Sequence, residues 1–138
     1  MTTDELRGRF IAEIEARGRD DKYIDGLEER ELLQIAVQHG FSTDEARRFL
    51  VEVCQSRGYV IEAAVVQRIR DSLRQFGCVS RRGFERIVND VRPSVMGTTR
   101  SDADLRRLVA TTLDDSAVRI RTGWFGDWFA RLKREVGA

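Results

Sequence analysis

The sequence predicts an all-α fold, a compact bundle of about seven helices that forms a single domain. Three observations predict it: apolar residues recur at helical spacing along most of the chain, there is one proline, and runs of β-branched residues are few. The 138 residues are 41% hydrophobic and 34% charged, which fits one charge-rich helical domain with its own core.

The first three predicted helices cover about residues 3–17, 26–39 and 42–57. In the first helix, Leu6, Phe10 and Ile14 recur every four residues and predict one buried face. The third begins with a capping box, in which Ser42 accepts a hydrogen bond from the amide of Glu45 and the Glu45 side chain reaches back. The second and third helices also carry apolar stripes, so we expect all three to pack on a core.

The remaining helices are predicted at about 60–76, 80–92 and 101–114, followed by an amphipathic segment at 124–136. Ser80 caps the fifth helix and Pro93 stops it. Ser101 and Asp104 cap the sixth. The fifth and sixth predicted helices therefore each have a start signal of their own.

The predicted domain has a core of residues 1–93, a linker of residues 94–100 and a C-terminal helical hairpin, residues 101–138, packed on the core. Within the core, residues 23–53 are nearly repeated by residues 59–91, at an offset of about 36–38 residues. Each copy has a short extended step, a helix, a glycine turn and another helix. The repeat predicts one helical hairpin stacked on a copy of itself.

Two turns resemble the second half of an EF-hand loop, in which a glycine is followed by an apolar residue and then by the exiting helix. In the first turn, Ile24 is the apolar residue that pairs with a partner loop and Glu28 takes the last ligand position. In the second turn, Val79 is the apolar residue. This resemblance predicts EF-like helical hairpins. Arg17 and Arg19 at early ligand positions disfavour calcium, so we expect no metal and no cofactor.

An acidic stretch from Asp21 to Glu28 and a G-x-S-x-x-E turn from Gly40 to Glu45 each precede a predicted helix. On these motifs, residues 20–92 resemble the tellurite-resistance TerB-like helical domains. The resemblance implies an all-helical module of bacterial signalling and stress systems. It also implies an alternative function, metal binding by the acidic cluster of that family, at the positions Asp20, Asp21, Asp25 and Glu28.

Charge and motifs argue against two classes of function. The chain has 24 basic and 23 acidic residues, whereas a dedicated nucleic-acid binder usually has a clear basic excess. His39 is the one histidine, no nucleophile elbow accompanies it, and there is neither a P-loop nor a G-x-G-x-x-G motif. We therefore expect a non-enzymatic protein, with nucleic acid disfavoured as a partner.

Protein–protein interaction is the favoured function, as an adaptor in a bacterial regulatory or stress-response system. It would use the arginine-rich face of the fourth and fifth helices together with the aromatic C-terminal segment, because aromatic residues and arginine dominate binding hot spots. The predicted partner-binding residues are Arg81, Arg82, Arg86, Trp124 and Trp128. The aromatic segment has two other interpretations, closure of the domain's own core and an interfacial membrane helix.

A helix-turn-helix that binds DNA is the alternative function. The predicted helix of residues 42–57 would then be the recognition helix, with Arg47 and Arg48 facing the DNA. Asp44 and Glu45 on the same helix would repel phosphate, which disfavours this interpretation.

The expected location is the cytoplasm. The first residues lack the basic start and apolar run of a signal peptide, and no stretch approaches the length of a membrane span. We expect Cys54 and Cys78 to be reduced thiols. The sequence leaves the identity of the partner and the oligomeric state open.

Overall fold

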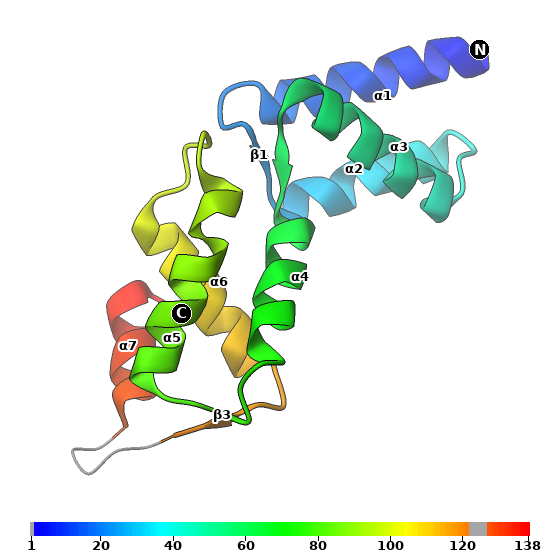
Figure 1. Cartoon of the computed structure of the whole chain (residues 1–138). Helices are drawn as coiled ribbons and strands as arrows, with labels where there is room; N and C mark the ends of the chain where they lie inside the picture. The colour runs from blue at the N-terminus through cyan, green and yellow to red at the C-terminus, as the bar shows by residue number, and fades with distance from the viewer. Residues whose placement is uncertain (1, 122–126) are drawn as a thin grey trace. The chain divides into compact units, whose positions relative to one another are not determined.

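The computed structural model describes residues 2–121 and 127–138 of the chain (Figure 1). In these residues the chain forms seven α-helices and four strands of two residues each, so the predicted all-α fold class is confirmed. The helices are α1 (Thr3–Gly18), α2 (Gly26–Gln38), α3 (Thr43–Arg57), α4 (Glu62–Leu73), α5 (Arg81–Val91), α6 (Asp102–Asp114) and α7 (Trp128–Val136). The strands are β1 (Tyr23–Ile24), β2 (Val60–Ile61), β3 (Cys78–Val79) and β4 (Arg119–Ile120), and a 3-10 helix, η1 (Arg92–Val95), follows α5.

The chain folds into two compact units. Unit 1 contains the described residues up to Ala63 together with residues 97–99, and unit 2 contains residues 64–96 and the described residues from Arg100 onward. The boundary between the units therefore lies near the start of α4. The predicted linker of residues 94–100 joins α5 and α6, which pack against each other within unit 2.

Unit 1 packs α1, α2 and α3 around one core, with a short parallel ladder at its edge. In this ladder Tyr23 lies opposite Val60 and Ile24 lies opposite Ile61. The buried Tyr23 places its hydroxyl where it donates a hydrogen bond to Glu62 Oε2 at 2.8 Å. The Tyr23 hydroxyl therefore ties the β1 segment to the start of α4.

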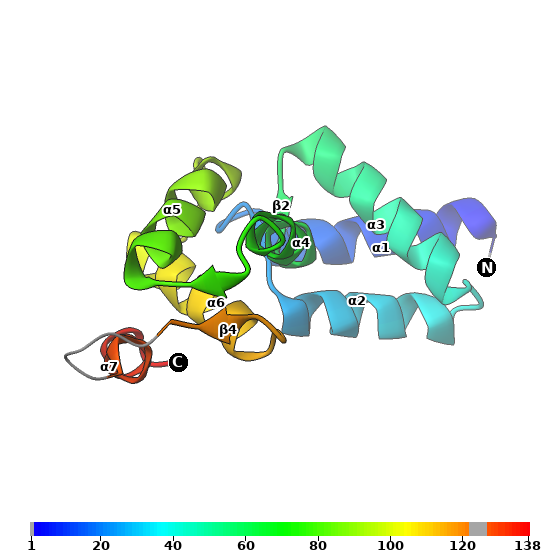
Figure 2. The same ribbon diagram turned by 60° about the horizontal axis from the view of Figure 1, so that its bottom comes forward.

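Unit 2 contains the second parallel ladder, in which Cys78 lies opposite Arg119 and Val79 lies opposite Ile120. Figure 2 labels β4 beside α6, which it follows in the chain. The apolar residue of each EF-like turn thus pairs with a later segment of its own unit.

The two units are built on one α-β-α-α-β module. β1 and β3 lie 55 residues apart in the sequence, as do Asp25 and Ser80, the N-caps of α2 and α5. β2 and β4 lie 59 residues apart, as do Ser42 and Ser101, the N-caps of α3 and α6. The predicted repeat at an offset of about 36–38 residues is therefore wrong. It aligned α2 and α3, the second and third helices of the first module, with α4 and α5, the first and second helices of the second module. The two segments look alike because each contains a short strand, a helix and a glycine.

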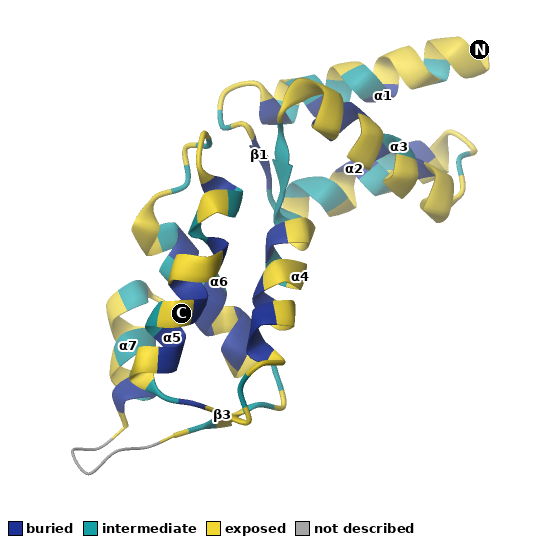
Figure 3. Cartoon of the chain, in the orientation of Figure 1, coloured by how far each residue is buried: buried dark blue, intermediate teal, exposed yellow. Residues whose placement is uncertain are grey.

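The cores of the two units correspond at five positions of these helices. In Figure 3 the inward faces of α5 and α6 are buried, and their outward faces are exposed. The matched buried pairs are Leu32 and Ile87, Ala36 and Val91, Ala46 and Leu105, Leu50 and Val109, and Cys54 and Leu113. Two copies of one apolar pattern therefore build two separate cores.

The last residue of α1 allows a close approach in unit 1. The ring of Tyr59 lies over Gly18, where an added Cβ would be 2.5 Å from Tyr59 Cδ2 and 2.7 Å from Tyr59 Cε2. Tyr59 directly precedes β2, so the absent side chain at Gly18 lets the β2 segment lie close against α1.

Candidate partner-binding surface

The charges of the chain are divided unequally between the two units. Unit 1 has nine basic and 14 acidic residues, a formal net charge of −5. Unit 2 has 15 basic and nine acidic residues, a formal net charge of +6. The net charge of +1 for the whole chain therefore conceals one acidic unit and one basic unit. A basic unit of this kind attracts anionic partners.

The β3–β4 ladder gathers four arginines at one edge of unit 2. Arg119 pairs with Cys78, and the backbone amide of Arg121 donates to the carbonyl of Val79 at 2.8 Å. Arg81 and Arg82 follow β3 directly, as the first two residues of α5. We call Arg81, Arg82, Arg119 and Arg121 the arginine rim. All four are exposed, and their guanidinium groups form no ion pair or hydrogen bond within residues 2–121 and 127–138.

The start of α5 strengthens this positive potential. Ser80 caps the helix by accepting from the amide of Gly83 at 3.2 Å, and the first turn contains no acidic residue. The positive end of the helix dipole therefore adds to the charges of Arg81 and Arg82. Because like charges crowd this helix end, an acidic partner side chain would relieve the repulsion.

A polar hollow of about 480 Å³ lies between α4 and α5, close to the third predicted arginine of this helix, Arg86. Arg68 on α4 also lines it and donates to Ser94 Oγ at 2.6 Å. At its base the buried Ser72 donates to Asp90 Oδ2 at 3.1 Å. The hollow contains charges of both signs, so it is not a simple anion site, and Arg86 lies 5.8 Å from the centroid of the Phe76 ring.

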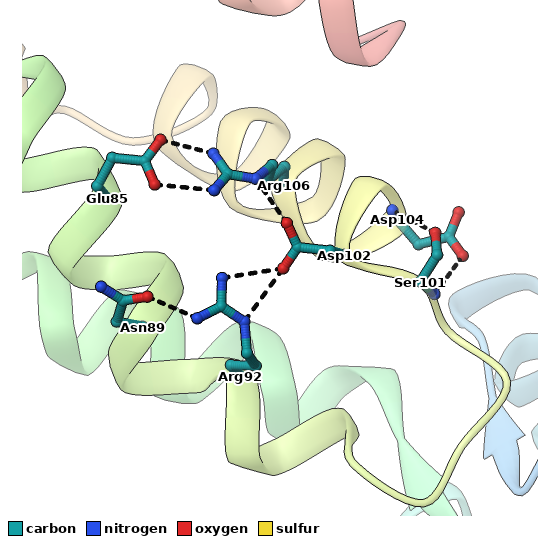
Figure 4. A network of polar contacts seen from close by, with 7 residues as sticks. All are labelled: Glu85, Asn89, Arg92, Ser101, Asp102, Asp104 and Arg106. Carbon is teal, nitrogen blue, oxygen red and sulfur yellow. Dashed lines mark hydrogen bonds and ion pairs between the residues drawn. The ribbon is translucent and has the colours of Figure 1, made fainter.

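A network of ion pairs holds α5 against α6 next to the rim (Figure 4). Arg106 binds both carboxylate oxygens of Glu85, at 2.6 and 2.8 Å, and donates to Asp102 at 2.8 Å. Arg92 also donates to Asp102, and to the side chain of Asn89. The hydrogen bonds from Arg106 lower the pKa of Glu85, and those from Arg106 and Arg92 lower the pKa of Asp102. These two arginines are therefore committed to the fold, which leaves the rim arginines for a partner.

The structure corrects the expectation that Trp128 is presented to a partner. Its side chain is 8% exposed, its ring packs on Phe84 and Phe129, and its indole N–H donates to the carbonyl of Arg121 at 2.6 Å. Apolar burial and a satisfied donor together make it part of the core of unit 2. Trp124, the other predicted tryptophan, lies outside the described residues. A membrane span would need a longer and more apolar helix than any that the described residues form.

The carboxylates of the metal-binding alternative cap a helix. Asp25 accepts from the amide of Glu28, and Glu28 accepts from the amide of Asp25, at 2.8 and 3.1 Å. Burial and the nearby charges of Asp25 and Asp21 raise the pKa of Glu28. In the described ranges no three histidine, cysteine or acidic side chains, Asp20 included, are grouped so that they could hold a metal ion.

The arginines of the DNA-binding alternative lie in the acidic unit. Arg47 and Arg48 are both exposed on α3. The first turn of this helix carries Asp44 and Glu45, and unit 1 has a net charge of −5. Phosphate would therefore be repelled from the helix that this interpretation places against DNA.

The sequence matches no protein-family model, no curated protein and no solved structure. The function of the chain is therefore inferred from its own charges and contacts.

Arg119 and Arg121, half of the arginine rim, were not among the candidate residues predicted from the sequence. A sum of charges over each half of the chain would have pointed to them, but the strand pairing that joins them to Arg81 and Arg82 depends on the fold.

Proposed function

We propose that this protein is a non-enzymatic protein–protein interaction module that binds an acidic surface of another protein through the arginine rim. The unequal division of charge supports this proposal: unit 2 has a net charge of +6, and its four rim arginines form no ion pair within the described residues. Arginine suits the role because its planar guanidinium binds a carboxylate through two hydrogen bonds. As a module without catalytic motifs, it would act as an adaptor in the cytoplasm, in a bacterial regulatory or stress-response system.

A protein partner is favoured over nucleic acid because unit 1 is covalently joined to unit 2 and has a net charge of −5. A long polyanion would be attracted by one unit and repelled by the other, whereas a compact acidic patch can contact the rim alone. Nucleic-acid binding by the arginine rim is the second candidate function, since a basic surface of exposed arginines also binds phosphate.

Fluorescence anisotropy with the full-length protein tests the proposal. The probes are a labelled oligoglutamate peptide, a short DNA duplex and a single-stranded RNA, each titrated over salt concentrations from about 0.05 to 0.5 M. We expect the oligoglutamate to bind more tightly than either nucleic acid. Tighter binding of DNA or RNA, with a steep inverse dependence on salt, would favour the second candidate function.

Two double variants make a matched pair, because both change the net charge equally. Arg81→Glu with Arg82→Glu should weaken oligoglutamate binding by about tenfold or more, since two exposed charges at the rim are reversed. Arg47→Glu with Arg48→Glu, on α3, should change it by about twofold or less. Equal weakening by both variants would show that only net charge matters, and the proposed surface would be abandoned.

A further inference from the structure

The two copies of the module differ in burial at one face. In α5 and α6, eight apolar residues are buried, and five of their counterparts in α2 and α3 are buried too. The other three buried residues are Phe84, Val88 and Ala110. At the equivalent positions unit 1 has Glu29 and Leu33, which are half-buried, and Val51, which is 37% exposed.

The helix α7 covers this face in unit 2. Trp128 of α7 packs on Phe84, with ring centroids 6.2 Å apart. On α6, Arg107 Nε donates to the carbonyl of Val136 at 2.7 Å, and Asp114 lies 3.3 Å from Lys133 Nζ. Positions 107, 110 and 114 lie on one side of a helix, so Ala110 faces α7 as well.

Unit 1 has no helix of its own in this place. The counterpart of α7 in the first copy of the module is α4, and from Ala64 onward that helix belongs to unit 2 as its first helix. The uncovered face of unit 1 consists of Glu29 and Leu33 on α2 and Val51 on α3, and we call it the α2–α3 face. Leu33 is half-buried and Val51 is 37% exposed. A partner that covered this face would bury both aliphatic side chains beside the half-buried Glu29.

Glu29 gives the α2–α3 face its chemical character. It stands where unit 2 has Phe84, and its side chain forms no ion pair or hydrogen bond within the part of unit 1 that the structure describes. Its charge lies close enough to α3 to contribute, after burial, to raising the pKa of Cys54 to about 11. The face therefore combines an unpaired, half-buried carboxylate with aliphatic side chains, in a unit of net charge −5.

We propose that the α2–α3 face binds an amphipathic helix of a partner protein, with a lysine or arginine opposite Glu29 and aliphatic side chains over Leu33 and Val51. In unit 2 the helix α7 packs on the equivalent face of α5 and α6, so this module can bind a helix at that face. Charge complementarity selects a basic residue in place of Trp128, because an indole would leave the Glu29 carboxylate desolvated and unpaired. The face lies in unit 1, away from the arginine rim in the sequence, and gives the adaptor a second binding surface.

The test uses the full-length protein and two labelled, hydrocarbon-stapled peptides. One has the sequence of residues 127–138, and the other has the same sequence with Trp128→Lys. We expect the Trp128→Lys peptide to bind about tenfold more tightly than the native peptide, because in the position that α7 takes in unit 2 the lysine stands opposite Glu29. Tighter binding of the native peptide would overturn the proposal and identify α7 of a second copy as the occupant. Absence of binding by the Trp128→Lys peptide would also overturn it.

Variants of the protein locate the binding site. Val51→Asp and Glu29→Lys should each weaken binding of the Trp128→Lys peptide by about tenfold. Leu27→Asp is the matched control, because Leu27 is 59% exposed on α2 but lies outside the α2–α3 face, and it should leave the affinity unchanged. Equal affinities for wild type, Val51→Asp and Glu29→Lys would show that the peptide binds elsewhere and would refute the assignment. Far-UV circular dichroism confirms that each variant is folded, and Glu29→Gln repeats the test if Glu29→Lys is not.

Discussion

Gly18→Ala should destabilise unit 1, although alanine is ordinarily the better helix residue. The new Cβ would lie 2.5 and 2.7 Å from two ring carbons of Tyr59, closer than carbon atoms approach in folded proteins. Relief requires a shift of the Tyr59 ring, which directly precedes β2 and packs against the core of unit 1. Overpacking of this kind costs about 1–3 kcal/mol. The gain in helix propensity offsets about 0.5–1 kcal/mol of that cost.

The free energy of unfolding should therefore fall by up to about 2.5 kcal/mol, measured by urea unfolding followed by far-UV circular dichroism. Gly8→Ala is the matched control in the same helix. No atom lies within 4 Å of the Cβ position at Gly8, so the propensity gain stands alone and should raise the free energy of unfolding by about 0.5–1 kcal/mol. Adding Tyr59→Ala to Gly18→Ala and to wild type completes a double-mutant cycle, in which the Gly18 penalty should vanish once the ring is removed.

Tryptophan fluorescence provides an independent record of unit 2 in the same experiment, because both tryptophans of the chain belong to that unit. A Gly18→Ala protein as stable as Gly8→Ala would refute the close packing of Tyr59 on α1. A penalty that persists in the absence of the Tyr59 ring would refute it as well.

The remaining predictions concern pH and thiol chemistry. The pKa values of Glu85 and Asp102 are lowered in the folded chain. Their pairing with Arg106 therefore stabilises the folded chain fully above their ordinary pKa values of about 4. This stabilisation is lost as the pH falls through the lowered pKa values. Arg106→Gln should thus lower the free energy of unfolding by at most about 1 kcal/mol at neutral pH, and by less at about pH 3, in urea titrations. Cys54 is buried and its pKa is raised to about 11, whereas Cys78 is exposed. Ellman's reagent should therefore modify Cys78 alone in the native protein and both thiols in denaturant; rapid modification of Cys54 in the native protein would contradict its burial.

The helices could be predicted from the sequence because their signals are local. Ser42, Ser80 and Ser101 were all predicted as N-caps, and each accepts a hydrogen bond from a backbone amide of the first turn. The third helix was predicted to end at residue 57, and Gly58 caps it there with φ at 74°, a left-handed conformation that favours glycine. The return bond from Glu45 to Ser42 is the exception: the Ser42 hydroxyl accepts from the Glu45 amide, but α3 lacks the reciprocal half of the predicted capping box.

The strand pairing could not be predicted, and much of the candidate surface depends on it. Strands of two residues carry too little pattern to be recognised, and a parallel pair joins segments that are far apart in the sequence. The rim arginines Arg119 and Arg121 meet Arg81 only through such a pair. The sequence allowed three interpretations of the aromatic C-terminal segment, and the burial of Trp128 agrees with one of them, closure of the domain's own core. The sequence could not choose among them, because an aromatic residue suits a buried core and a binding interface equally well.

The connection between α5 and α6 has a consequence for dissection of the chain. Residues 97–99 belong to unit 1, where the amide of Thr99 donates to the carbonyl of Asp21 at 3.0 Å. The polypeptide therefore leaves unit 1 after Ala63, returns to it for three residues and leaves again. A fragment ending at Ala63 would leave the Asp21 carbonyl without its donor, and a fragment starting at Ala64 would carry the returning segment with nothing to hold it. Neither unit is a continuous stretch of sequence, so proteolytic or genetic cuts between them should yield pieces less stable than the intact chain.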